Sequence, residues 1–160
     1  MTAIIETMVF RAQPELCDGC RMCELVCSLS KTGTVNPHLA RIRVAPSDKG
    51  FVPGQPRPTI CRHCDNARCA AVCPIPGAIA VNERTGVLVI DEAKCNRCMA
   101  CVEACPFDAM WAGPNNEVLK CDLCDGDPLC VKRCPYRPEN SMPTLPFPKM
   151  SCLQFVERRR

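Results

Sequence analysis

Short apolar runs, rich in β-branched residues, alternate along the chain with longer polar stretches. Residues 4–9 are apolar and β-prone, which predicts a strand or a lead-in segment. Residues 40–45 alternate between apolar and polar positions, which predicts a strand with one solvated face. Two β-prone runs, 77–81 and 87–90, flank a polar turn that ends in glycine and predict a β-hairpin, and residues 108–111 are a candidate closing strand.

Polar and proline-rich stretches between these runs predict loops. Residues 28–37 are polar and contain a glycine and a proline, so we expect a loop there. Residues 46–58 hold two glycines and four prolines, which predicts an irregular connector, and residues 113–116 form a further turn. Near the end of the chain prolines recur, and residues 144–160 are expected to form an extended, basic tail on the surface.

Composition changes this picture, because the apolar runs are too few to build a large core. The 160 residues include seventeen cysteines and sixteen prolines, but only five Phe, one Trp and one Tyr. A chain with so thin an apolar core needs disulfides or metal to hold it together. The first residues show no secretion signal and no stretch is apolar enough to span a membrane, so we expect a cytoplasmic protein, in which grouped cysteines bind metal.

Sixteen of the seventeen cysteines fall into four runs that share a Cys-x2-Cys start and a Cys-x3-Cys end. The runs are Cys17, Cys20, Cys23 and Cys27; Cys61, Cys64, Cys69 and Cys73; Cys95, Cys98, Cys101 and Cys105; and Cys121, Cys124, Cys130 and Cys134. The third run, which is followed at once by a proline, has the bacterial ferredoxin spacing for [4Fe–4S] clusters. The repeat therefore predicts four such clusters, because soft thiolate ligands suit iron–sulfur chemistry.

Zinc is the main alternative for a chain with paired Cys-x2-Cys motifs. Structural zinc commonly takes its four ligands as two separate pairs, whereas these cysteines come as three plus one, and a scaffold of eight disulfides fits the compartment less well. The formal charge of +3 does not favour a nucleic-acid partner, because four clusters of about −2 each would bring the protein to about −5. The sequence has no nucleotide-binding loop and no nucleophile–base grouping, so no catalytic activity is expected.

The four runs, together with the string Lys-Cys-Asp-Leu-Cys at residues 120–124, resemble the four-cluster ferredoxin subunits of modular oxidoreductases. This is the family of small iron–sulfur subunits that serve dimethyl sulfoxide reductases, formate dehydrogenases and hydrogenases. The resemblance implies an α+β fold of tandem, nested two-cluster modules, with small antiparallel hairpins and short helices around four clusters. The implied divisions are a polyferredoxin domain, 1–143, with an outer module of about 13–54 plus 113–143 and an inner module of about 55–112, and the tail, 144–160.

In this family each cluster takes three cysteines from one run and the last cysteine of a partner run. Carried over to this chain, the resemblance implies four ligand sets: Cys61, Cys64, Cys69 and Cys105; Cys95, Cys98, Cys101 and Cys73; Cys17, Cys20, Cys23 and Cys134; and Cys121, Cys124, Cys130 and Cys27. Two positions depart from the family pattern. Ser28 follows Cys27 where proline is usual, and residues 136–140 replace the usual start of the outer module's last strand.

The resemblance implies a non-catalytic subunit that carries single electrons between a catalytic oxidoreductase subunit and a ferredoxin or other redox partner. A tungsten or molybdenum aldehyde oxidoreductase is the favoured catalytic partner, with a hydrogenase, formate dehydrogenase or carbon monoxide dehydrogenase as the alternative. A zinc-binding regulatory protein is a rival hypothesis from another class. Self-association into a filament through the tail is a third hypothesis.

A few residues near the runs remain to be placed. Cys152 is left over by the repeat and is expected to be a free thiol, with a ligand role as the alternative. His63 is expected to be a hydrogen-bonding neighbour of a cluster or a surface residue, and Trp111 to belong to the core. Three arginines either offset cluster charge, meet an acidic partner or are solvated loop charges: Arg62, Arg68 and Arg97.

Overall fold

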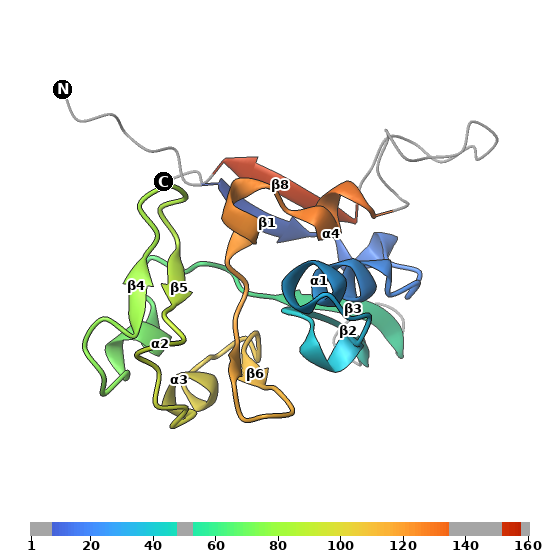
Figure 1. Ribbon diagram of the computed structural model, residues 1–160. Coiled ribbons are helices and arrows are strands. Elements are labelled where there is room, and N and C mark those ends of the chain that lie inside the picture. Colours follow the sequence, from blue (N-terminus) through green and yellow to red (C-terminus); the bar gives the residue numbers. More distant parts are fainter. Residues whose placement is uncertain (1–7, 48–52, 135–151, 158–160) are drawn as a thin grey trace.

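Short strands paired in twos and short helices make up the part of the chain that the computed structural model describes, residues 8–47, 53–134 and 152–157 (Figure 1). The strands are β1 (Met8–Ala12), β2 (Ile42–Ser47), β3 (Gln55–Ile60), β4 (Ile79–Val81), β5 (Leu88–Ile90), β6 (Trp111–Ala112), β7 (Val118–Leu119) and β8 (Leu153–Glu157). The helices are α1 (Met22–Thr32), α2 (Arg68–Ala71), α3 (Ala100–Glu103) and α4 (Leu129–Lys132), with 3-10 turns η1 (Pro14–Leu16), η2 (Pro37–Leu39) and η3 (Leu123–Gly126). The antiparallel pairs are β1–β8, β2–β3, β4–β5 and β6–β7. This is an α+β arrangement, as the sequence predicted.

The predicted hairpin at residues 77–90 is confirmed. Strands β4 and β5 pair antiparallel, with Ile79 opposite Ile90 and Val81 opposite Leu88. The strand predicted at residues 40–45 is also present as β2. The closing strand begins only at Trp111, in β6, and it pairs with β7 across the predicted turn. Of the segment predicted at residues 4–9, β1 begins at Met8, and residues 4–7 lie outside the described part of the chain.

The prediction of an irregular connector at residues 46–58 is wrong at both of its ends. Strand β2 continues to Ser47, and β3 begins at Gln55 and pairs with β2 along its whole length. Pro56 and Pro58 fall on alternate positions of β3, opposite Pro46 and Val44. Because every second residue of a strand turns its N–H away from its partner, prolines at this spacing remove no hydrogen bond from a two-stranded sheet.

The prediction of a loop from residue 28 is also wrong, because helix α1 continues to Thr32. The polar side chains that suggested a loop are satisfied within the helix and its cap. The Ser28 hydroxyl donates to the Leu25 carbonyl and accepts from the Asn36 N–H, and the Thr32 hydroxyl donates to the Ser28 carbonyl. Gly33, with φ at 71°, then ends the helix in the left-handed conformation.

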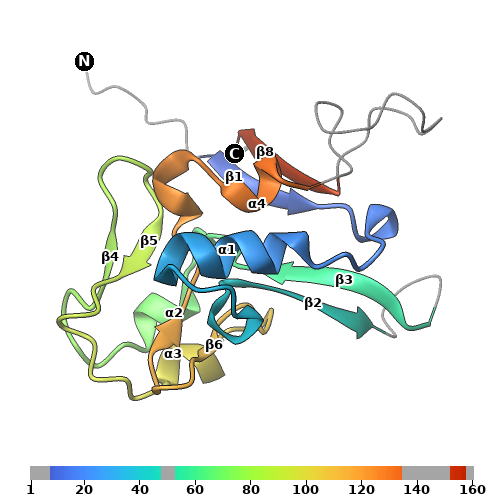
Figure 2. The same ribbon diagram turned by 45° about the vertical axis from the view of Figure 1, so that its right-hand side comes forward.

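The elements separate into two halves, which are visible in both views (Figures 1 and 2). In the long-helix half, α1 packs against α4 and against the β2–β3 pair, and β8 packs on α4 beside β1. The double-hairpin half holds β4–β5, β6–β7, α2 and α3. Its core of fully buried residues is small: Cys101, Met110 and Val118.

The core of the long-helix half is larger. It makes up most of a cluster of fifteen buried residues, among them Ile42, Leu123 and Leu153, which Val87 of the β4–β5 hairpin also joins. The contacts that tie the halves together include two hydrogen bonds: the Trp111 indole N–H donates to the Ala40 carbonyl at 3.1 Å, and Asn82 of the β4–β5 turn donates to Asp125 of η3. None of the helices within the described ranges has both the length and the apolar character needed to cross a bilayer.

Part of the segment predicted to be an extended tail is a packed strand. Strand β8 pairs with β1 at the other end of the chain, with Leu153 opposite Ala12. Cys152 and Leu153 are both buried in the core of the long-helix half. The rest of the predicted tail, residues 144–151 and 158–160, lies outside the described residues.

Candidate metal centres

All seventeen cysteines are free thiols, and they line four cavities within the described residues. Each cavity has in its wall three cysteines from one run and one from another, and takes its name here from the first of the three. The Cys17 cavity has Cys17, Cys20, Cys23 and Cys134; the Cys121 cavity has Cys121, Cys124, Cys130 and Cys27; the Cys61 cavity has Cys61, Cys64, Cys69 and Cys105; and the Cys95 cavity has Cys95, Cys98, Cys101 and Cys73. These groupings coincide with the four sets that the resemblance implies.

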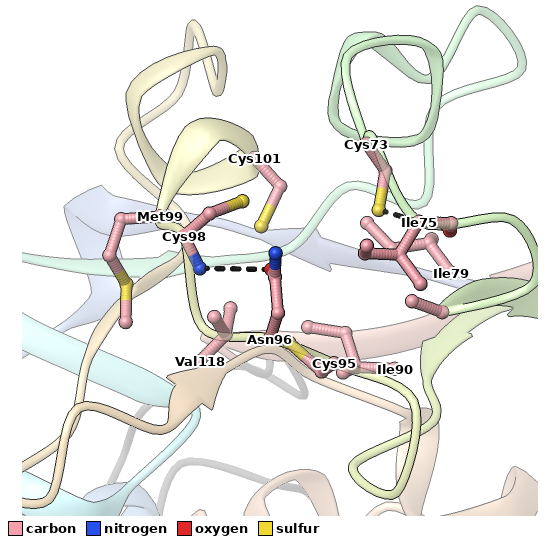
Figure 3. A pocket seen from close by; sticks show the side chains of 11 residues that line it. Cys73, Ile75, Ile79, Ile90, Cys95, Asn96, Cys98, Met99, Cys101 and Val118 are labelled. Atoms are coloured by element: carbon pink, nitrogen blue, oxygen red, sulfur yellow. Dashed lines mark hydrogen bonds between the residues drawn. The ribbon is translucent and has the colours of Figure 1, made fainter.

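The Cys95 cavity shows how such a site is enclosed (Figure 3). Its cysteines come from a loop, from α3 and from the end of the α2 turn, and the space between them measures about 310 Å³. Apolar side chains of Ile79, Ile90 and Val118 complete the wall. Within the loop, the Asn96 side-chain oxygen accepts from the Cys98 N–H at 3.3 Å, which holds the chain in a tight curl.

The Cys-x2-Cys loops of all four runs adopt the same backbone turn. The residue just before the second cysteine is left-handed in every case, with φ of 80° at Gly19, 48° at His63, 59° at Arg97 and 60° at Leu123. Three of these four residues are not glycine, so the conformation costs energy that the surroundings must offset. Alternation of right- and left-handed residues turns successive N–H groups inward and creates a concave site for an anion.

Backbone N–H groups also point directly at cysteine sulfurs. The N–H of Arg41 donates to the Cys27 sulfur at 3.2 Å, that of Leu123 to the Cys121 sulfur at 3.4 Å, and that of His63 to the Cys61 sulfur at 3.5 Å. Hydrogen bonds of this kind stabilise negative charge on a thiolate and on the cluster that it binds, and they are among the factors that set a cluster's reduction potential.

The Cys-x3-Cys end of each run lies on a helical turn that joins two cavities. On α1, Cys23 lines the Cys17 cavity and Cys27, one turn later, lines the Cys121 cavity. Four residues of helix advance about 6 Å, so one turn presents two cysteines on one face to neighbouring sites. The same spacing on α2, α3 and α4 links the other cavities, because the fourth cysteine of each run always lines a different cavity from the first three.

Neighbouring thiols reveal the order in which the cavities lie. Burial raises the pKa of the Cys121 thiol, and the nearby Cys61 thiol raises it further, so the Cys121 and Cys61 cavities are neighbours. Burial also raises the pKa of Cys130, and Cys23 is among the thiols that add to this effect. The Cys121 cavity therefore lies between the Cys17 and Cys61 cavities.

The Cys95 cavity lies at the other end of this row. The pKa of the Cys101 thiol is raised to about 11, first by burial and then by its neighbours, which include Cys69 of the Cys61 cavity. The row thus runs from the Cys17 cavity through the Cys121 and Cys61 cavities to the Cys95 cavity. Cysteines of the two end cavities and of the Cys61 cavity reach the surface, since Cys20, Cys98 and Cys64 are exposed.

The Cys61 cavity differs from the other three in size and charge. Its space, about 1160 Å³ including its open mouth, compares with about 330 Å³ for the Cys17 cavity and about 300 Å³ for the Cys121 cavity. Buried Lys120 lines it and donates to the Leu88 carbonyl, so a positive charge lies beside the cysteines. Arg62 stacks over the Phe107 ring, 3.9 Å from its centroid, and His63 is buried in the wall.

The donor sets fit [4Fe–4S] clusters. Each cavity offers at least four thiols, and backbone N–H groups donate to cysteine sulfurs of the Cys61 and Cys121 cavities, which is the ligand chemistry that an anionic iron–sulfur cube requires. Among the described residues, no three His, Cys, Asp or Glu side chains converge closely enough to hold a single metal ion. The cysteines instead surround spaces that are several atoms wide.

Two residues of the Cys17 site were not anticipated in these roles. Cys152 lines the cavity, where its hydrogen bond lowers the pKa of the Cys17 thiol to about 7. Glu24 is almost fully buried on α1, where its carboxylate accepts from the Val44 N–H at 2.7 Å and from Arg21. The sequence signal for Glu24 is its place beside Cys23 on the inward face of α1, but Cys152 has no local signal.

The remaining predicted residues occupy different places. Trp111 is buried, as predicted, and Arg43 stacks on its ring at 4.2 Å. Arg97 donates to the Asn115 carbonyl at 3.1 Å and so braces the Cys95 loop against the β6–β7 turn. Arg68 lines the mouth of the Cys61 cavity and is exposed.

These cysteine-lined cavities on a frame of small strand pairs define an iron–sulfur protein of the ferredoxin type. Comparison with known families agrees: the model of the 4Fe-4S dicluster domain matches residues 54–141, and that of a 4Fe-4S binding domain matches residues 14–33. The chain therefore belongs to the 4Fe-4S dicluster family.

Several relatives with similar sequences are named as subunits of redox enzymes. The polyferredoxin-like subunit of the aliphatic sulfonate oxidoreductase of Pyrococcus furiosus is 42% identical over 76% of this chain and 68% of its own length. The beta subunit of the NADH-dependent phenylglyoxylate dehydrogenase of Aromatoleum evansii is 35% identical over 77% of this chain, which spans only 27% of that protein. Formate hydrogenlyase subunit 2 of Escherichia coli K12 is 29% identical over 79% of this chain and 77% of its own length.

Proposed function

We propose that this chain is an electron-transfer subunit that binds four [4Fe–4S] clusters, one in each of the cysteine-lined cavities. The observation that carries the proposal is the distribution of sixteen cysteines over four cavities, three from one run and one from another in each. When bound there, the clusters supply one-electron chemistry. The residues of the chain fix the spacing of the sites, exclude water and set the charge around them.

The order of the cavities supports a path along a single row. Runs two and three line the Cys61 and Cys95 cavities, and runs one and four line the Cys17 and Cys121 cavities, which supports the proposed division into nested inner and outer modules. The Cys121 cavity lies inside the row, and none of its four cysteines is exposed. Partners are therefore expected to meet the row at one of the other three cavities, near Cys20, Cys64 or Cys98, which are exposed.

A catalytic oxidoreductase subunit is the proposed partner at one end, with a ferredoxin or another redox subunit at the other. The names of the relatives support this assignment, since they are subunits of oxidoreductases. A tungsten or molybdenum enzyme remains the favoured catalytic partner, on the resemblance of the cysteine runs to small subunits of such enzymes. The formate hydrogenlyase relative favours a formate- or hydrogen-metabolising enzyme as the second candidate.

Metal and sulfide analysis tests the cluster content. Anaerobically purified protein is expected to contain about sixteen irons and sixteen acid-labile sulfides per chain, as four cubes require, and to give a paramagnetic signal on reduction with dithionite. About four zinc ions per chain and no sulfide would overturn the proposal in favour of a zinc protein. Co-purification from the native host, followed by analysis for tungsten, molybdenum and nickel, separates the candidate catalytic partners.

A further inference from the structure

A fifth cysteine lies in the wall of one cavity. Cys152 lines the Cys17 cavity in addition to Cys17, Cys20, Cys23 and Cys134. The Cys121, Cys61 and Cys95 cavities each contain four cysteines in their described walls. The Cys17 site is therefore chemically different from the other three, and it is an end of the row.

The fold holds Cys152 in this place. Its carbonyl accepts from the Gln13 N–H at 2.8 Å, and the next residue, Leu153, pairs with Ala12 and is buried in the same core. The side chain of Cys152 is 3% exposed. It is thus a fixed part of the wall, brought in by the pairing of β8 with β1.

The thiol shares its cavity with two of the proposed ligands from different segments. These are Cys17, which follows η1, and Cys134, which follows α4. A cube has four irons, and four cysteines already provide one sulfur for each of them. A fifth thiol therefore has no iron left to bind, but it can donate a hydrogen bond to the cysteine sulfurs that bind iron.

We propose that Cys152 is a non-ligand thiol of the Cys17 site that donates its S–H hydrogen to the cluster's sulfur ligands and raises the reduction potential of this cluster above the value that it would otherwise have. This inference rests on the proposed function. A donor to a thiolate stabilises the more negative, reduced cluster, so that its potential rises.

The test uses the full chain carrying its clusters, with Cys152→Ala, Cys152→Ser and a control, Val26→Ala. Val26 packs against the same core without lining the cavity. All variants are expected to keep the iron and sulfide content of the unaltered protein. In a redox titration followed by electron paramagnetic resonance, Cys152→Ala lowers one of the four potentials and leaves the other three, whereas Cys152→Ser, which keeps a donor, shifts it less and Val26→Ala shifts none.

A second measurement detects the hydrogen itself. Electron–nuclear double resonance of the reduced protein, in H₂O and D₂O, is expected to show an exchangeable proton coupled to this cluster that Cys152→Ala lacks and Val26→Ala retains. Loss of one cluster's iron from both Cys152 variants would overturn the proposal and make Cys152 a ligand. Four unchanged potentials in Cys152→Ala would overturn it as well, whereas unaltered protein without iron would instead refute the proposed function.

Discussion

The two halves of the molecule carry the same number of cysteines from the four runs on very different amounts of apolar core. The long-helix half contributes most of a buried cluster of fifteen residues, including Ile42, Leu123 and Leu153, and contains an eleven-residue helix. The double-hairpin half buries three residues in its own cluster, and its helices α2 and α3 are single turns of four residues. Since isolated turns and two-stranded hairpins are marginal in water, the second half must depend more on what its cysteines bind.

Removing the clusters is expected to have the largest effect, and an unequal one. The iron-free chain should lose most of its far-UV circular dichroism signal, because metal binding and folding are coupled in such sites. In hydrogen exchange followed by mass spectrometry, amides of β4–β5 should exchange without protection, whereas amides of α1 should keep part of their protection from exchange. The same protein after cluster reconstitution is the control.

Two outcomes would contradict this expectation. A native-like far-UV spectrum of the iron-free chain would show that folding does not need the clusters. Equal loss of protection in α1 and in β4–β5 would show that the size of the apolar core does not distinguish the halves.

Features that depend on neighbouring residues could be predicted from the sequence, and features that depend on contacts between distant segments could not. Cysteine spacing sorts sixteen residues into four runs, and β-branched residues at 79–81 and 88–90 identify a hairpin. Strand β3 was not predicted, because its alternate prolines are typical of a connector. These prolines lie at positions whose backbone nitrogens face away from β2, so they do not prevent pairing. The left-handed turns at His63, Arg97 and Leu123 are equally hidden, because no glycine signals them.

Cys152 shows the limit most clearly. Its neighbourhood in the sequence is proline-rich and basic, which favours a tail. Its position depends instead on pairing between β8 and β1, at opposite ends of the chain. No local pattern encodes such a contact, so the predicted ligand groups did not reveal the fifth thiol of the Cys17 cavity.

Removing a buried hydrogen bond within the long-helix half is expected to have the next largest effect on stability. Glu24 joins α1 to β2, since its buried carboxylate accepts from the buried Val44 N–H at 2.7 Å. Glu24→Ala leaves that N–H without its acceptor and should cost about 2 kcal/mol of unfolding free energy. Glu24→Gln keeps a carbonyl oxygen for the same bond and should cost less than half as much.

Glu15→Ala is the matched control, because this carboxylate is exposed on the same half of the molecule. It should change stability by less than about 0.5 kcal/mol. The measurement is denaturant unfolding of the cluster-containing protein under anaerobic conditions, followed by the loss of cluster absorbance. Equal losses in Glu24→Ala and Glu15→Ala would mean that the bond between α1 and β2 does not support this half.

Removing the Trp111 hydrogen bond between the halves should have the smallest effect on stability. This change tests how far each half depends on the other for its stability. The Trp111 indole N–H of β6 donates to the Ala40 carbonyl beside β2 at 3.1 Å, and Arg43 of β2 stacks on its ring. Trp111→Phe removes the donor and leaves a buried carbonyl without it, at a cost of about 1 to 2 kcal/mol. Arg43→Ala keeps the hydrogen bond and removes only an exposed cation–π contact, worth about 0.5 kcal/mol.

Hydrogen exchange separates a local from a global consequence of this contact. If the double-hairpin half relies on the long-helix half for support, Trp111→Phe raises exchange in β6–β7 and in β4–β5 while α1 keeps its protection. Arg43→Ala should raise exchange only near β2 and β6. If Trp111→Phe instead exposed α1 as strongly as the hairpins, the halves would unfold as one unit, and the difference in their cores would have no separate consequence for stability.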